Sequence, residues 1–147
     1  MAKLYIAYGS NMDEEQMAYR CPDAQLWGTA EVEGYRLLFK GSKTGAYATI
    51  EPEEESRVPV LVWKISEADE KMLDRYEGFP RFYYKKELEI EYEGERKTAM
   101  VYLMHEENPL GIPSRRYQEV LSNAYRKFGF DSAVLKRALA ESNTLKI

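Results

Sequence analysis

Residues 82–105 constrain the fold more than any other part of the sequence. Over residues 82–92, mostly apolar side chains alternate with mostly charged ones, and only Lys86 breaks the pattern. A period of two is typical of a β-strand with one face buried. Glu93-Gly94 then supplies a two-residue turn signal, and a second apolar segment follows at residues 98–105. The sequence therefore predicts an antiparallel hairpin.

Four other segments have the short apolar runs expected of strands. They lie at residues 4–8, 32–40, 46–50 and 58–65, and the acidic residues 51–55 between the last two are expected to form a turn. Together with the hairpin they make six predicted strands, most of them with antiparallel neighbours. This pattern suggests a curved sheet or a small barrel.

Helix signals lie between and after these strands. Ser66 is a good N-cap with Asp69 three residues later, and Gly78 provides a stop for the helix that follows. Caps followed by apolar residues at the helical period recur in the last third of the chain. The predicted helices cover residues 12–20, 66–77, 114–128 and 131–140.

The length of 147 residues corresponds to about one domain with one compact core. We therefore expect a single α+β domain over residues 1–147. Its expected architecture is a small mixed or antiparallel β-barrel of about six strands, with α-helices packed around the outside.

The net charge and the hydropathy of the chain limit which classes of binding partner are expected. The net charge of −4 provides no overall field that would attract a polyanion, so nucleic acid is not an expected partner. The apolar run at residues 4–8 is too short for the core of a signal peptide and far too short to cross a bilayer. We therefore expect a soluble, cytoplasmic protein with no membrane partner.

The chain has one cysteine, Cys21, and one histidine, His105, which removes several chemistries. A lone cysteine forms no internal disulfide, in keeping with a reducing cytoplasm. These two residues provide no cluster of ligands for zinc, haem or an iron–sulfur group, so we expect no cofactor and no metal site of these kinds. The 25 acidic residues still allow a Mg²⁺ ion bound by carboxylates. A catalytic triad would need His105, which is predicted to end a strand. Any chemistry must therefore use a carboxylate, hydroxyl groups and backbone donors.

The first candidate site is the segment Tyr8-Gly9-Ser10-Asn11-Met12, where an apolar strand meets Gly, Ser and Asn and then a predicted helix. Glycine allows the backbone to turn tightly or to approach a ligand, and N–H groups at a helix start can bind an anion such as a carboxylate. The alternative is an ordinary strand-to-helix turn in which Asn11 or Asp13 is the N-cap.

The second candidate is Glu77, at the end of a predicted helix. The negative end of the helix dipole and burial among neighbouring aromatic residues would both raise the pKa of its carboxyl group. A carboxylate with a raised pKa suits proton transfer near neutral pH. The alternative is a surface glutamate paired with Arg75 or Arg81.

The third candidate is Tyr117, in the first turn of the helix that begins after Ser114. Its phenol could reach the carboxylate of a ligand. The alternative is a tyrosine that belongs to the hydrophobic core, as is usual on an apolar helix face.

These segments together resemble the γ-glutamylcyclotransferase family over nearly the whole chain, and their order and spacing carry the resemblance. They are Tyr5-Ile6-Ala7-Tyr8-Gly9-Ser10-Asn11-Met12, Ala48-Thr49-Ile50, Val62-Trp63-Lys64-Ile65, Leu73-Asp74-Arg75-Tyr76-Glu77-Gly78, Tyr84-Lys85-Lys86, Tyr102-Leu103-Met104, and Pro113-Ser114 with Tyr117. Relatives specific for glutathione carry Leu after Tyr-Gly-Ser, and Asn11 argues against that branch.

The resemblance implies a γ-glutamylcyclotransferase-type enzyme with a cavity at one end of a small barrel. In such enzymes the free α-amine of a γ-glutamyl group attacks its own side-chain amide, which gives 5-oxoproline and releases the attached amine or amino acid. A single glutamate acts as acid and base. The partner would be a small γ-glutamyl compound, and the chain would be a monomer or a homodimer. The alternative is a non-catalytic module that binds a small molecule or a partner in the same pocket.

Matched to the family, Glu77 falls on the catalytic position and Tyr117 on a tyrosine that contacts substrate. The family also has a tyrosine a few residues after the catalytic glutamate, and we assign it to Tyr84 rather than Tyr83, because Tyr84 shares the apolar face of its predicted strand. The substrate-binding segment would consist of Tyr5, Ile6, Ala7, Tyr8, Gly9, Ser10 and Asn11.

Overall fold

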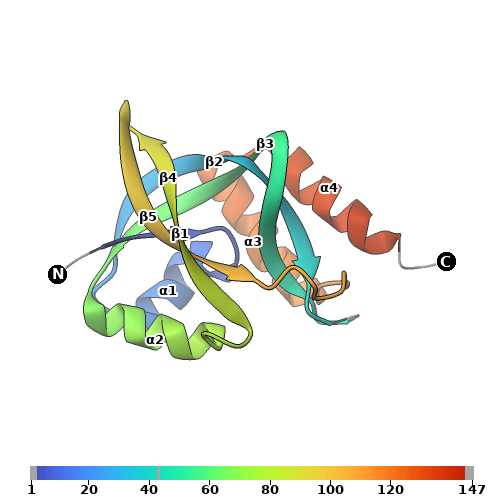
Figure 1. The fold of residues 1–147 in the computed structure, drawn as a ribbon, viewed down its shortest axis with the longest axis horizontal. Helices are drawn as coiled ribbons and strands as arrows, with labels where there is room; N and C mark the ends of the chain where they lie inside the picture. The colour runs from blue at the N-terminus through green and yellow to red at the C-terminus, as the bar shows by residue number, and fades with distance from the viewer. Residues whose placement is uncertain (1–2, 43, 145–147) are drawn as a thin grey trace.

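A computed structural model describes residues 3–42 and 44–144, so the ends of the predicted domain lie outside the described residues. In this part of the chain, one mixed sheet is flanked by helices (Figure 1). The strands are β1 (Lys3–Ala7), β2 (Gln25–Lys40), β3 (Tyr47–Ile65), β4 (Tyr83–Tyr92) and β5 (Glu95–Met104). Their order is β2-β3-β1-β5-β4, with β1 antiparallel to β3 and parallel to β5.

The described residues form five strands rather than the six predicted. Residues 46–50 and 58–65 were expected to be separate strands, but β3 runs through both and pairs with β2 along its length. The acidic residues between them bend the strand without ending it: Glu55 has a φ of 65°, and the register shifts between Glu33 and Tyr35. The long partner strand β2 keeps the ladder continuous on both sides of this bend.

The predicted hairpin is confirmed. β4 pairs with β5 in antiparallel fashion from Tyr83 opposite Met104 to Tyr92 opposite Glu95. Glu93 and Gly94 form the turn, both with positive φ, as a type I′ hairpin requires.

The sheet curls until its two edges approach each other, which makes the fold barrel-like. The Tyr92 ring of β4 stacks on the Trp27 ring of β2 with 4.8 Å between centroids, and the Tyr92 hydroxyl donates to the Trp27 carbonyl. Among the described residues no ladder joins β2 to β4. The α+β architecture is thus confirmed, with a barrel that side chains rather than backbone hydrogen bonds bring together.

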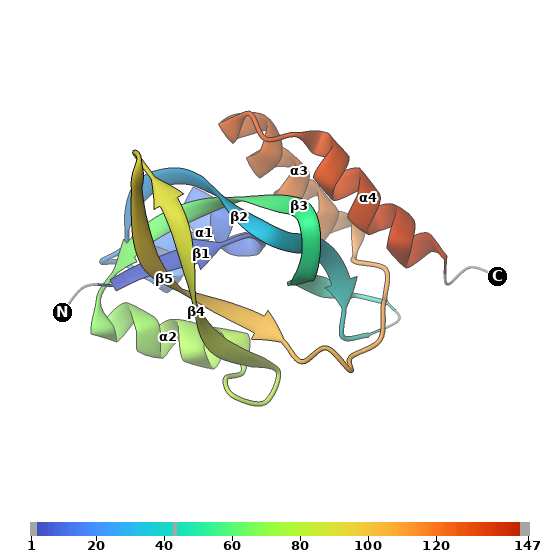
Figure 2. The ribbon, with the colours of Figure 1, turned by 45° about the horizontal axis from the view of Figure 1, so that its top comes forward.

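The helices are the short η1 (Ser10–Met12), α1 (Glu14–Arg20), α2 (Glu67–Glu77), α3 (Arg115–Phe128) and α4 (Ser132–Asn143). Figures 1 and 2 show α2 on one side of the sheet and α3 with α4 on the other. The helix predicted over residues 12–20 is divided, because Asp13 caps α1 and η1 precedes it. No helix in the described ranges has the length and apolar character needed to cross a membrane.

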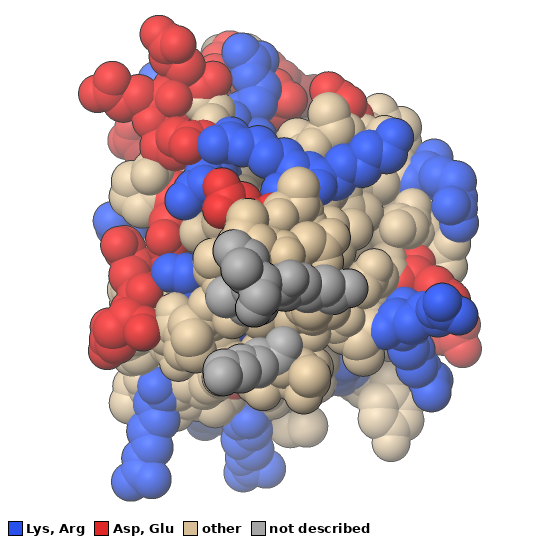
Figure 3. Space-filling view, turned by 90° about the vertical axis from the view of Figure 1, so that its right-hand side faces the viewer, with Lys and Arg blue, Asp and Glu red and all other residues tan. Residues whose placement is uncertain are grey.

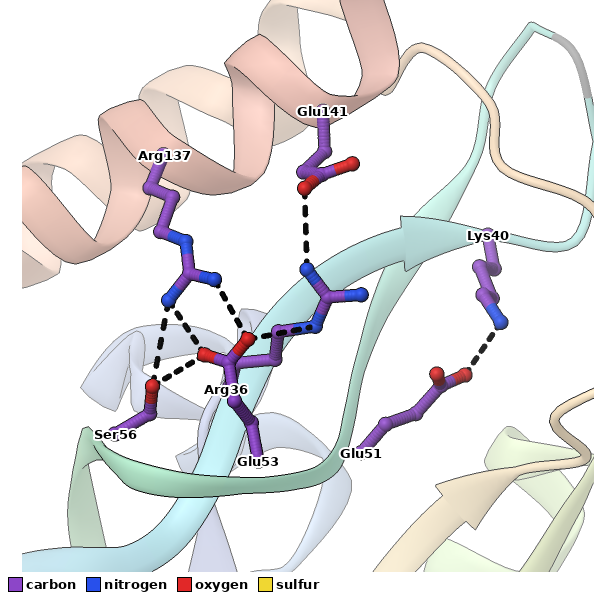
Figure 4. Close-up of polar contacts among 7 residues, drawn as sticks. All are labelled: Arg36, Lys40, Glu51, Glu53, Ser56, Arg137 and Glu141. Carbon is purple, nitrogen blue, oxygen red and sulfur yellow. Dashed lines mark hydrogen bonds and ion pairs between the residues drawn. The ribbon is translucent and has the colours of Figure 1, made fainter.

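Ion pairs hold α4 against the sheet (Figure 4). Both guanidinium NH groups of Arg137 donate to the Glu53 carboxylate, at 2.6 and 2.7 Å. Arg36 of β2 bridges from the same carboxylate to Glu141 of α4. On the side of the molecule shown in Figure 3, Lys and Arg side chains accordingly lie close to Asp and Glu side chains.

The predicted start and stop of α2 are both present. The Ser66 side chain accepts from the Asp69 N–H, and the Asp69 side chain accepts from the Ser66 N–H, which together form a capping box. Gly78 adopts the left-handed conformation that ends the helix. These two caps determine that Glu77 is the last helical residue.

We expect Ser66→Ala to lower the free energy of unfolding by about 1 kcal/mol, because it leaves a helix N-terminal N–H without its acceptor. Urea denaturation followed by circular dichroism measures this. Ser132→Ala is the matched control, since Ser132 is exposed in the first turn of α4, which Asp131 caps. Equal effects of the two substitutions would contradict the role of the capping box.

Candidate active site

A pocket of about 200 Å³ opens where the end of α2 meets the β1–η1 turn, the start of β3 and the start of α3. Most of its lining side chains are aromatic, and Glu77 is the one carboxylate among them. The lining residues are Tyr5, Tyr8, Gly9, Ser10, Asn11, Tyr47, Ala48, Tyr76, Glu77, Phe82, Tyr83, Tyr102 and Tyr117.

The structure brings most of the predicted site residues together in this pocket. Tyr5, Tyr8, Gly9, Ser10, Asn11, Glu77 and Tyr117 all line it. Ile6 and Ala7 lie in the same strand but are buried in the hydrophobic core and are not among the lining residues. Their side chains anchor this segment in the core, so that Tyr5 before them and Tyr8 after them can line the pocket.

The assignment of Tyr84 to the pocket is corrected, because Tyr83 takes that place. The Tyr83 hydroxyl donates to the Ala48 carbonyl at 2.7 Å, whereas the Tyr84 ring packs 4.9 Å from the His105 ring. The prediction assumed that the charged face of β4 points to solvent. It does so at Glu87, Glu89 and Glu91, which are exposed, but the start of the same face is covered. There Tyr83 is buried and Lys85 pairs with Asp74 of α2 at 3.1 Å.

The Glu77 carboxylate is partly buried at the negative end of α2. No hydrogen bond or ion pair joins this carboxylate to another residue in ranges 3–42 and 44–144, and neither Arg75 nor Arg81 pairs with it. Burial raises the pKa of Glu77 to about 7, and the positive charge of Arg20 opposes part of the rise. Glu77 can therefore exchange a proton near neutral pH.

Asn11 fixes the turn rather than capping α1. Its side-chain amide donates to the Tyr5 hydroxyl at 2.8 Å, and its backbone carbonyl accepts from the Trp63 indole at 3.0 Å. Its side-chain oxygen accepts from Arg20. The turn is thus held from β1, β3 and α1 at once.

Arg20 is a residue that sequence reasoning missed. Its guanidinium lies 3.6 Å from the centroid of the Tyr76 ring and donates to Ser10 as well as to Asn11. Arg20 is distant in sequence from Tyr76, so no local pattern indicated the contact.

The phenol groups of the pocket are fixed by the backbone. The Tyr8 hydroxyl donates to the Tyr102 carbonyl at 2.6 Å, and the Tyr117 hydroxyl accepts from the Ala48 N–H at 3.1 Å. Burial raises the pKa of Tyr8 and of Tyr117 above the ordinary value, so both stay neutral. They can offer hydrogen bonds to a ligand without adding charge.

Tyr117 approaches Gly9 closely. A Cβ atom at position 9 would lie 3.0 Å from the Tyr117 hydroxyl, which is tighter than most Cβ contacts, so the hydroxyl would have to shift. The chain leaves β1 at this glycine and enters η1, whose first N–H groups have no acceptor within the turn. Small size at position 9 therefore keeps the backbone open toward the pocket.

Within the described residues, no group of three or more His, Cys, Asp or Glu side chains is placed to hold a metal ion. The arrangement offers one carboxylate that titrates near neutrality, several neutral hydroxyl groups and the N–H groups of a tight turn. Such a set can bind a small polar molecule and move protons within it.

Comparisons with known proteins agree on one family. The model of the family described as gamma-glutamyl cyclotransferase, AIG2-like, matches residues 5–125. The human gamma-glutamylcyclotransferase is 31% identical over 137 aligned residues, which cover 86% of this chain and 71% of the human protein, and the bovine protein matches equally well. A solved gamma-glutamyl cyclotransferase structure superimposes with a TM-score of 0.82 at 26% identity, covering 99% of this chain and 87% of the other.

We expect Glu77→Gln to stabilise the protein above pH 7. A carboxyl group whose pKa rises from 4.5 to about 7 on folding supports the fold fully below pH 4.5, and this support is lost as the pH rises to about 7. Ionised Glu77 should therefore cost about 3 kcal/mol at pH 8, which glutamine avoids. Urea denaturation at pH 5 and pH 8 measures the difference between wild type and variant.

The matched control is Glu87→Gln, because Glu87 is exposed on β4 and outside the pocket. It should change the free energy of unfolding by less than about 0.5 kcal/mol at both pH values. If the difference in free energy of unfolding between the Glu77→Gln variant and the wild type is the same at pH 5 and pH 8, the Glu77 carboxylate is not desolvated.

Proposed function

The chain belongs to the gamma-glutamyl cyclotransferase, AIG2-like family, and we propose that it converts the γ-glutamyl group of a γ-glutamyl amine or amino acid to 5-oxoproline with Glu77 as acid and base. The observation that carries the proposal is the Glu77 carboxylate, whose pKa of about 7 places it between acid and base in an otherwise neutral pocket. The human and bovine relatives are named gamma-glutamylcyclotransferases, which are enzymes, and this supports turnover as well as binding.

The size of the pocket fits one compact group. The pocket volume of about 200 Å³ lies below the roughly 300–1,000 Å³ of pockets for larger ligands. A γ-glutamyl group must fold back on itself for its α-amine to reach its own side-chain amide. A small pocket favours this folded shape, and an intramolecular attack gains much of its rate from proximity.

The protons balance with one carboxylate. The α-ammonium loses two protons on becoming the lactam N–H, a C–N bond forms to the amide carbon, and the original amide C–N bond breaks. The departing nitrogen gains two protons and leaves as an ammonium group. Glu77 can take each proton as a base and return it as an acid, because its pKa lies near neutrality.

The turn between β1 and η1 would bind the substrate's α-amino-acid head. Backbone N–H groups at Gly9 and Ser10 can bind the α-carboxylate or the oxyanion of the transition state. Neutral phenols such as Tyr117 can add hydrogen bonds. No cofactor is needed for this reaction.

We propose a reducing compartment such as the cytoplasm for this enzyme, because Cys21 is a free, buried thiol. Its partner would be a small γ-glutamyl compound rather than nucleic acid or a membrane. A monomer or a homodimer fits the proposal equally.

Glu77→Gln should lower the rate of 5-oxoproline formation about 10²–10⁴-fold, because glutamine keeps the shape but transfers no proton. The measurement uses a panel of γ-glutamyl amines and amino acids, with 5-oxoproline followed by mass spectrometry. Glu87→Gln should keep wild-type rates. Thermal stabilisation of the wild type by glutamate-like ligands, with no product from any panel member, would favour a binding module instead.

The pH dependence of kcat/KM should have an acidic limb near pH 7, because protonated Glu77 cannot accept the first proton. Arg20→Gln removes a charge that lowers the pKa of Glu77, so the limb should move to higher pH by about 0.5–1 unit. Arg75→Gln serves as the control, since Arg75 is an exposed arginine of α2, the helix that carries Glu77. A limb that stays in place in the Arg20 variant would contradict the electrostatic link.

A further inference from the structure

Exposed aromatic side chains gather at the pocket. In the described ranges, the large hydrophobic side chains that stay exposed are Tyr19, Tyr47, Met72, Tyr76 and Phe79. Two of them, Tyr47 at 47% and Tyr76 at 48%, line the same pocket as Glu77. Exposed rings forgo the free energy of burial, so rings that collect at a cavity indicate a surface that binds an apolar group.

Tyr47 belongs to a packed series of rings. Its ring lies edge-to-face against Phe82, with 6.1 Å between centroids, and against Tyr117, at 5.4 Å. Phe82 in turn packs edge-to-face against Tyr83 at 5.1 Å. These contacts hold Tyr47 in place although half of it is exposed, so little side-chain entropy would be lost when a ligand packs on it.

Tyr76 comes from a different element and is also held. The Arg20 guanidinium covers one face of its ring at 3.6 Å from the centroid, and its hydroxyl lies 3.3 Å from the Ser10 hydroxyl. A second cation at this ring would meet the charge of Arg20. A neutral ring, in contrast, gains contact there without electrostatic cost.

The proposed reaction places the leaving group beside these rings. The departing nitrogen must lie within reach of the Glu77 carboxylate, and Tyr76 directly precedes Glu77 in α2. With the amino-acid head at the β1–η1 turn, the group attached to the nitrogen has to extend toward the exposed part of the pocket, where Tyr47 and Tyr76 are found.

We propose that Tyr47 and Tyr76, supported by Phe82, form a leaving-group subsite that selects γ-glutamyl amides of amines bearing a neutral aromatic ring. The inference rests on the proposed function. It adds the chemical class of the released amine, which the γ-glutamyl-binding part of the pocket does not determine.

The test compares kcat/KM for four substrates: the γ-glutamyl derivatives of benzylamine, cyclohexylmethylamine and ethylamine, and the mono-γ-glutamyl derivative of 1,4-diaminobutane. The wild type should prefer the benzylamide over the ethylamide by about tenfold, with the cyclohexyl compound between them. The diamine derivative should not exceed the ethylamide. Tyr47→Ala should bring the benzylamide-to-ethylamide ratio close to one.

Tyr19→Ala is the matched control, because Tyr19 is 90% exposed on α1 and outside the pocket, and it should keep the wild-type ratio. Urea denaturation of the Tyr47 variant checks that it folds. A wild-type ratio near one, a preference for the diamine derivative, or a ratio unchanged in Tyr47→Ala would overturn the subsite while leaving the proposed function in place. No turnover of any of the four compounds would also overturn the subsite, and silence on the γ-glutamyl amino acids as well would reject the proposed function.

Discussion

A carboxylate withdrawn from water without an ion-pair partner is the constraint around which the pocket is arranged. Glu77 ends α2 where the helix dipole is unfavourable to its charge, and burial raises the pKa of its carboxyl group to about 7. Such a group destabilises the fold whenever it is ionised. The fold is therefore less stable with Glu77 ionised than it would be with a neutral residue there. Such a loss of stability is typical of a site whose chemistry needs a proton donor and acceptor in one residue.

The ends and flanks of α2 keep this carboxylate in place. Ser66 and Gly78 determine where the helix begins and ends. Glu77 is therefore the last residue of the helix, and a shift of either helix end would break a cap. On the side facing the sheet, Asp74 accepts from the Tyr102 hydroxyl at 2.6 Å and pairs with Lys85. The helix is thereby tied to β4 and β5 one turn before Glu77, so the sheet and this carboxylate form one unit.

Features set by neighbouring residues could be predicted from the sequence, and features set by distant ones could not. Glu93-Gly94 and the capping box of Ser66 are local signals, because turn type and helix start depend on adjacent residues. Tyr83 was misplaced because only the start of the charged face of β4 is covered, and its burial depends on long-range contacts such as the hydrogen bond to Ala48 of β3. Arg20 was missed for the same reason: its partner ring lies on a different helix.

The proposed use of one carboxylate as both acid and base requires that Arg20 influence Glu77 without pairing with it, and within the described residues no ion pair joins the two. A direct ion pair would lower the pKa of Glu77 well below neutrality and leave it unable to return a proton. Arg20 instead donates to Asn11, Ser10 and Gln16 and stacks on Tyr76, so that its charge opposes the desolvation of Glu77 without cancelling it. The neutral phenols add no competing charge. The pKa near 7 thus results from burial offset by a positive charge that is held in place by other partners.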